Sequence, residues 1–154
     1  MREHLRIRLA LASERLALQE LQRRASLSNP GDREALLANP DAIDLPLEQI
    51  TAGHVFVLET AGSVKGFAAI LPREDGNAEL DTLFVEPDTW RQGLGRALID
   101  YCATTARARG AAAIYVVGNP HAEGFYAACG FERVGAVTTR FGVGLSMRRV
   151  LSPM

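Results

Sequence analysis

The feature that most constrains the fold is a strand–helix–strand unit over residues 78–117. The run AELDTLFV is strand-like, a helix is expected from about Leu94 to Arg109, and AAAIYVV follows as a buried-looking strand. A helix that crosses between two strands of one sheet returns the chain in the same direction. The sequence therefore predicts one pair of neighbouring parallel strands.

The other strand patterns favour antiparallel neighbours. They are the alternating run from Leu5 to Leu11, HVFVLET, VKGFAAIL, FERVGAV and the final VGLSMRRVL. Short turns such as Ala61–Ser63 and Arg73–Asn77 are typical of antiparallel pairs. The predicted order is β-α-α-β-β-β-α-β-α-β-β, in a sheet that is mostly antiparallel.

Helix signals fill the gaps between these strands. Ser13 is expected to cap a helix that runs to about Ser28, and a short helix is expected around Arg33–Ala38. Asn119 and Pro120 are the residues that favour the start of another helix, because asparagine caps it and proline has no N–H to leave unpaired.

Composition limits the class of protein. The chain has 154 residues, 47% of them hydrophobic, which fits a single domain over residues 1–154. The net charge of −1 disfavours nucleic acid and anionic membranes as partners. The sequence has no long apolar run and no apolar leader, so we expect a cytoplasmic protein. Cys102 and Cys129 are expected to be buried free thiols, and the spacing of histidines and carboxylates predicts no metal site.

The stretch WRQGLGRAL, residues 90–98, is suited to an oxyanion. The first turn of a helix has backbone N–H groups without partners and the positive end of the helix dipole. Gly93 and Gly95 let a phosphate approach the backbone, and Arg91 and Arg96 can add charged hydrogen bonds. The signal is not a Walker loop, since it lacks the Gly-Lys-Ser/Thr end, and it is not a dinucleotide fingerprint, since Leu98 stands where the third glycine belongs.

The two segments LDTLFVEPDTWRQGLGRALI and NPHAEGFYAACGF together resemble two consecutive motifs of the GCN5-related N-acetyltransferase (GNAT) family. The first is similar to its acyl-CoA-binding motif, except that Trp90 stands where the family has Arg or Gln. The resemblance covers roughly residues 3–150. It implies an α+β fold, α/β/α sandwich-like, with a mixed, mostly antiparallel seven-stranded sheet and about four helices.

The resemblance also implies which residues hold acetyl-CoA, the co-substrate. In the family, main-chain N–H groups of the glycine loop hold the pyrophosphate. A tryptophan at position 90 in place of Arg or Gln therefore need not abolish binding. The simpler role of Trp90 is packing over the loop. The predicted cofactor-binding residues are Leu83, Phe84, Val85, Arg91, Gln92, Gly93, Leu94, Gly95, Arg96, Asn119 and Tyr126. Asn119 serves equally as a helix cap.

The implied reaction is acetyl transfer to a primary amine, which must first lose a proton. Glu79 and Asp81 are two apart on a strand and so share a face, and either carboxylate, directly or through water, is a candidate base. A main-chain N–H near Val85, where the resemblance implies that the strand splays from its neighbour, is expected to face the thioester carbonyl. Tyr126 matches the helical tyrosine that is the family's usual general acid. A phenol can protonate the leaving thiolate. The alternative role of Tyr126 is that of a core tyrosine.

The alternative to an enzyme is a non-catalytic acyl-CoA-binding or sensor domain with the same fold. The acceptor is expected to be a small-molecule amine or an amine of a protein, bound between residues 13–50 and the last two strands. A homodimer is possible. His121 is expected to be exposed and without a catalytic role.

Overall fold

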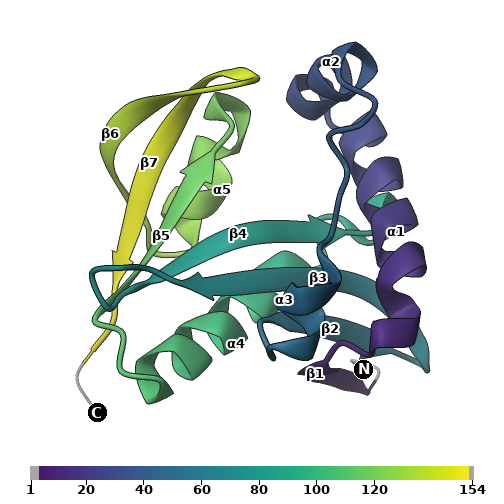
Figure 1. The fold of residues 1–154 in the computed structure, drawn as a ribbon, viewed down its shortest axis with the longest axis horizontal. Helices are drawn as coiled ribbons and strands as arrows, with labels where there is room; N and C mark the ends of the chain where they lie inside the picture. Colours follow the sequence, from purple (N-terminus) through teal and green to yellow (C-terminus); the bar gives the residue numbers. More distant parts are fainter. Residues whose placement is uncertain (1–3, 153–154) are drawn as a thin grey trace. The chain divides into compact units, whose positions relative to one another are not determined.

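The computed structural model describes residues 4–152, which form a seven-stranded mixed sheet and five α-helices (Figure 1). The strands are β1 (Leu5–Leu9), β2 (Val55–Thr60), β3 (Ser63–Pro72), β4 (Ala78–Val85), β5 (Ala113–Gly118), β6 (Glu132–Thr139) and β7 (Gly142–Val150). The helices are α1 (Arg15–Ser28), α2 (Pro30–Ala38), α3 (Leu47–Thr51), α4 (Leu94–Ala108) and α5 (Glu123–Ala128), with short 3-10 turns η1 (Ala12–Glu14), η2 (Pro87–Thr89) and η3 (Pro120–Ala122).

The strand order in the sheet is β1-β2-β3-β4-β5-β7-β6. β4 and β5 are parallel, with Ala78–Leu80 opposite Ile114–Val116. The pairs β1–β2, β2–β3, β5–β7 and β6–β7 are antiparallel. The predicted crossover and the predicted mixed, mostly antiparallel sheet are therefore confirmed.

The chain divides into two compact units. The first contains the residues up to Ala69 together with Thr82–Leu98, and the second contains Ile70–Asp81 together with the residues from Ile99 onward. The boundary passes through β3, β4 and α4, so the two halves of β4 belong to different units.

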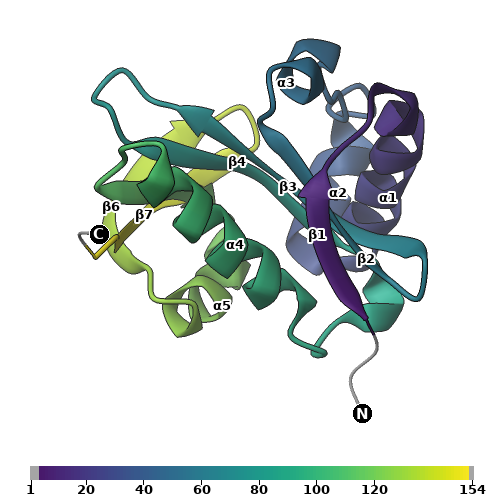
Figure 2. The same ribbon diagram turned by 90° about the horizontal axis from the view of Figure 1, so that it is seen from below.

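The first unit is built around β2 and β3. Val55 and Val57 of β2 and Phe67 of β3 join Leu18 and Leu21 of α1 in one buried cluster. Phe56 and Leu58 point to the opposite face of β2 and are also buried, which explains why HVFVLET is apolar at successive positions. Figure 2 shows β1 beside β2 at the edge of the sheet, as its antiparallel register requires.

The helix starts in this unit differ in part from those predicted. Ser13 lies inside η1 and is not the cap of α1; instead the Leu11 N–H donates to the Glu14 carboxylate over 2.8 Å. Arg8 donates two hydrogen bonds to the same carboxylate and thereby lowers the pKa of Glu14. Asn29 caps α2 by accepting from the Gly31 N–H, so that helix starts at Pro30, earlier than the predicted Arg33.

The second unit places helical segments against one face of β5 and β7. Ile114 of β5 and Met147 of β7 on that face are buried, and so is Cys102 of α4. Arg149 of β7 donates to the Asp100 carboxylate of α4 and to the carbonyl of Cys129, just after α5. Alternation along the strands makes the apolar positions of β5 and β7 the ones that face these helices.

β6 forms the outer strand of the second unit. It is exposed at every residue except the last, and its register to β7 shifts between Arg133 and Gly135. The shift marks a β-bulge, which leaves one residue of β6 without a partner position on β7.

Residues 4–152 contain no helix with the combined length and hydrophobicity that crossing a lipid bilayer requires.

Replacing Leu18 with alanine tests the core of the first unit. Leu18 is 1% exposed, so Leu18→Ala should lower the free energy of unfolding by about 2–5 kcal/mol, through lost burial and a residual cavity. Leu16 of the same helix is 69% exposed, and Leu16→Ala should change it by less than about 0.5 kcal/mol. Urea unfolding of both variants measures the difference. Equal losses would show that α1 does not bury the face described here.

Candidate active site

The glycine loop forms a tight bend between η2 and α4. Arg91 has φ 69° and Gly93 has φ 80°, so two positions of the bend lie in the left-handed region. The Gln92 N–H between them donates to the Thr89 carbonyl over 3.2 Å. A non-glycine residue in this region costs about 1–2 kcal/mol, and such strain is found most often at functional sites. Gly93 therefore adopts a φ that residues with a side chain rarely adopt, and Arg91 shares this left-handed region.

The bend leads directly into the N-terminus of α4. The Ala97 N–H donates to the Gly93 carbonyl over 3.0 Å, which is the first turn of the helix. The N–H groups of Leu94, Gly95 and Arg96 precede any helical acceptor and lie at the positive end of a 15-residue helix. Arg91, Gln92 and Arg96 are exposed, whereas Leu94 is buried and anchors the helix. This first unit thus brings the predicted pyrophosphate-binding residues together.

The end of β4 directs alternate backbone groups to opposite edges. The Glu86 N–H donates to the Lys65 carbonyl of β3 over 2.8 Å. The Phe84 carbonyl also faces β3, because it lies 3.0 Å from where a Cβ on Gly66 would be. Since backbone groups alternate along a strand, Leu83 and Val85 direct theirs to the edge away from β3. The pairing of β4 with β5 covers only Ala78–Leu80, so Leu83 and Val85 lie beyond it.

Two side chains hold this strand end. Arg24 of α1 donates two hydrogen bonds to the Glu86 carboxylate, over 3.0 and 2.6 Å, and this pairing raises the pKa of Arg24. Trp90 donates its indole N–H to the Val85 carbonyl over 3.0 Å. Trp90 is 40% exposed, so it contacts the strand end without being buried there.

The two candidate bases lie on the half of β4 in the second unit. Glu79 and Asp81 share a face, as predicted, with Glu79 half-buried and Asp81 exposed. Arg73 forms an ion pair with Glu79 over 3.2 Å, and its guanidinium stacks 4.0 Å from the ring centroid of Tyr115. Tyr115 is the register partner of Glu79 on β5. Glu79 is therefore held by a cation that the sequence analysis does not single out.

Tyr126 lies on α5, packed against the end of β5. Its ring makes edge-on contacts with Phe125 and Phe131, at centroid distances of 5.2 and 5.6 Å. A Cβ on Gly118 would lie 3.1 Å from Cε2 of Tyr126, which is a tight contact, so glycine lets the ring pack at this position without a shift. Gly118 is three residues beyond Tyr115 on β5, about 10 Å along the strand. Tyr126 thus packs at the end of β5, whereas Glu79 lies beside Tyr115, three residues earlier on that strand.

Asn119 caps the turn that follows β5. Its Oδ1 accepts from the His121 N–H over 2.9 Å, which confirms the predicted cap. His121 is exposed, as expected. Both cysteines are buried free thiols, and burial raises the pKa of Cys102 to about 12, so its thiolate is scarce at neutral pH.

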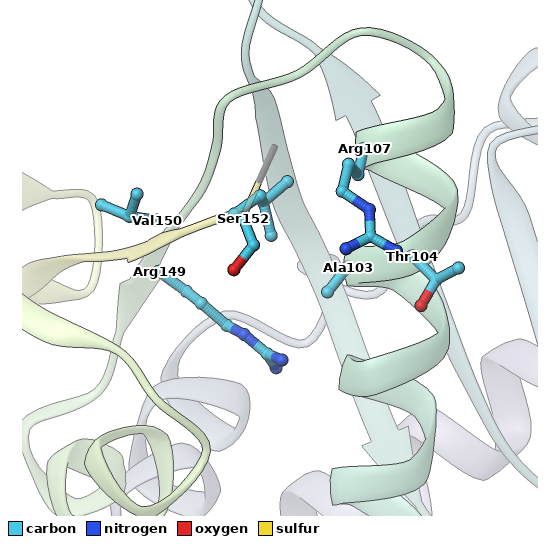
Figure 3. Close-up of a pocket in the computed structure, with 7 residues that line it drawn as sticks. Ala103, Thr104, Arg107, Arg149, Val150 and Ser152 are labelled. Atoms are coloured by element: carbon cyan, nitrogen blue, oxygen red, sulfur yellow. The ribbon is translucent and has the colours of Figure 1, made fainter. Parts of the chain in front are cut away.

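A small pocket of about 120 Å³ lies elsewhere in the second unit (Figure 3). The guanidinium groups of Arg107 on α4 and Arg149 on β7 line it, together with Ser152. Arg149 is already paired with the Asp100 carboxylate. None of the predicted site residues lines the pocket, and its volume is far below the 300–1,000 Å³ typical of ligand sites.

A model of the acetyltransferase (GNAT) family matches residues 17–131. The match includes both the glycine loop and Tyr126. The chain belongs to the GNAT family.

Solved structures with the GNAT fold cover nearly the whole chain. A GCN5-related N-acetyltransferase from Rhodopseudomonas palustris has a TM-score of 0.78 and 20% identity, over 98% of this chain and 97% of its own. The PaiA N-acetyltransferase from Thermoplasma acidophilum, solved in complex with coenzyme A, has a TM-score of 0.76 and 15% identity, over 96% and 99%. The ribosomal-protein-S18-alanine N-acetyltransferase from Escherichia coli has a TM-score of 0.70 and 22% identity, over 98% and 96%. These likenesses establish the fold, and no curated protein sequence matches the chain.

Four residues that contact predicted site residues or the end of β4 are absent from the sequence prediction. Gly66 and Gly118 make room for the end of β4 and for the Tyr126 ring, and Arg24 and Arg73 hold Glu86 and Glu79. Gly118 directly precedes the Asn-Pro pair and ends a strand, which is a usable sequence signal for close packing. The two arginines have no comparable local signal.

Replacing Gly118 with alanine tests the seat of Tyr126. The added Cβ should push the ring aside by a few tenths of an ångström, so the ring resonances of Tyr126 should shift in NMR spectra. Gly124 lies in α5 with nothing within 4 Å of an added Cβ, so Gly124→Ala should leave those resonances in place and stabilise the helix by about 0.5–1 kcal/mol. Unchanged resonances in Gly118→Ala would contradict the close approach.

Proposed function

We propose that this chain transfers an acetyl group from acetyl-CoA to a primary amine by direct attack. The observation that carries the proposal is the bend with left-handed Arg91 and Gly93 directly before the N-terminus of α4. Backbone N–H groups in such a bend form a concave donor set, and the helix dipole adds positive potential. In this proposal the N–H groups of residues 93–96 hold the pyrophosphate, with Arg91 and Arg96 adding charge. A coenzyme A complex of the structurally similar PaiA acetyltransferase supports this choice of co-substrate.

The pantetheine arm would pair with the edge of β4 that faces away from β3. Its amides can form hydrogen bonds with the backbone of Leu83 and Val85, as an added strand does. This pairing aims the thioester at the strand end. The Val85 N–H then stabilises the oxyanion that forms on the carbonyl, without reorganising during the reaction.

A carboxylate of β4 would accept the proton of the amine. The amine nitrogen forms a bond to the thioester carbon once its lone pair is free, and either Glu79 or Asp81 takes the proton, directly or through water. Arg73 holds the Glu79 carboxylate in place but also competes for its oxygen. Asp81 is more exposed and so better able to work through water. Comparing kcat between Glu79→Gln and Asp81→Asn shows which carboxylate is the base, because the variant that lacks the base should have the lower kcat.

Tyr126 would supply the proton that the leaving thiolate takes up. The carbon–sulfur bond breaks as the tetrahedral intermediate collapses, and the phenol O–H protonates the sulfur of coenzyme A. The packing of the ring against Gly118 supports the proposal, because a fixed ring keeps its hydroxyl in one place.

The acceptor would be a small amine or an amine of a protein. A protein acceptor has a precedent in the name of the Escherichia coli ribosomal-protein-S18-alanine enzyme. A screen that measures thiol release from acetyl-CoA over amines, amino acids and peptides tests this point. Binding of acetyl-CoA without turnover on any of them would favour the alternative, a non-catalytic acyl-CoA-binding domain.

Replacing Gly93 with alanine should weaken coenzyme A binding at least about tenfold, because the Cβ would occupy the space of the phosphate and disfavour the bend. Gly62→Ala is the matched control, since Gly62 has φ 79° in the β2–β3 turn and equally open surroundings. Calorimetric titration of both variants measures the effect. Equal affinities would show that the bend does not bind the pyrophosphate.

Replacing Tyr126 with phenylalanine should lower kcat by about 10²-fold or more, the range of a positioned acid, while the affinity for coenzyme A stays the same. Tyr101→Phe, on the exposed face of α4, should leave kcat unchanged. Steady-state kinetics and calorimetry measure the two quantities. A normal kcat in Tyr126→Phe would assign the acid to another group.

A further inference from the structure

Trp90 covers the backbone group that a pantetheine amide would need. Its indole Nε1–H donates to the Val85 carbonyl over 3.0 Å. That carbonyl lies on the edge of β4 away from β3, because the Glu86 N–H and the Phe84 carbonyl both face β3. The side chain of Trp90 therefore occupies an acceptor on the proposed pantetheine edge.

The indole is held there by this hydrogen bond and by partial burial. Trp90 is 40% exposed, so part of the ring already contacts water, and moving it uncovers the remainder. Its backbone is held on both sides, by the η2 turn, where its N–H donates to the Pro87 carbonyl over 3.3 Å, and by the left-handed Arg91. Rotation about the side-chain torsions would leave these backbone contacts in place.

We propose that Trp90 is a displaceable clasp on β4. The proposal rests on the proposed function, since the incoming group is an amide N–H of the pantetheine arm of acetyl-CoA. On binding, one hydrogen bond to the Val85 carbonyl is exchanged for another, and the indole moves into solvent. The exchange lowers the affinity of the site, because the ligand must first break a bond that the free protein makes to itself.

The size of this effect follows from the net worth of one hydrogen bond. Without the indole N–H, water solvates the Val85 carbonyl, and the ligand replaces water instead of a protein donor. A hydrogen bond within a protein is more favourable in free energy than the hydrogen bonds with water that it replaces. The net difference corresponds to about a 2- to 12-fold change in an equilibrium constant. Trp90→Phe keeps a ring but lacks the donor, so it should bind coenzyme A tighter by that factor.

Calorimetric titration with coenzyme A compares wild type, Trp90→Phe and Trp90→Leu. Both variants should bind more tightly than wild type, and testing two of them keeps the comparison if one folds poorly. Phe141→Leu is the control, because Phe141 is a similarly exposed ring in the β6–β7 turn, and it should bind as wild type does. Equal or weaker binding in the folded Trp90 variants would overturn the clasp.

Fluorescence gives an independent readout in wild type, because Trp90 is the only tryptophan in the sequence. Saturation with coenzyme A should shift its emission to longer wavelength and make it easier to quench with iodide, as the indole enters water. Unchanged or blue-shifted emission would overturn the clasp while leaving the proposed function intact. Failure of wild type and both variants to bind coenzyme A at all would overturn the two proposals together.

Discussion

The attachment of the end of β4 to β3 is the interaction on which the candidate site depends. The hydrogen bond from the Glu86 N–H to the Lys65 carbonyl fixes which backbone groups face β3 and which face away. Gly66 makes this attachment possible, because a side chain there would meet the Phe84 carbonyl at 3.0 Å. Once the strand end is fixed, the orientation of Val85 and the start of the loop after Pro87 follow from it. The pair between Arg24 and Glu86 adds α1 to the same anchor.

Local sequence signals predict a large part of the fold and of the loop. The bounds of β4 agree with the strand-like run 78–85, and α4 begins at Leu94 as its spacing indicates. These features depend on period and on residue type within a few positions, so a single sequence contains them. The left-handed Gly93 is predictable for the same reason, since glycine is the residue that adopts this conformation freely.

The parts that the sequence does not predict depend on how the backbone places particular side chains, which no local motif specifies. Ser13 has the right side chain for a cap, but it lies inside η1, where the Glu14 carboxylate accepts from the Leu11 N–H and pairs with Arg8. Arg73 reaches Glu79 across the turn between β3 and β4, where its guanidinium also stacks on Tyr115 of β5. The hydrogen bond of Trp90 is likewise unreadable from a motif, since it depends on which edge of β4 the Val85 carbonyl faces.

The bulge in β6 has a consequence for the behaviour of the protein at high concentration. A strand at the end of a sheet exposes a row of backbone donors and acceptors, which can recruit a strand from another molecule. The shift between Arg133 and Gly135 interrupts that row, and the charges of Glu132 and Arg133 lie next to the interruption. Only positions 135–139 of β6 are in continuous register beyond this shift. The irregularity thus shortens the regular edge to which another strand could add, without burying that edge.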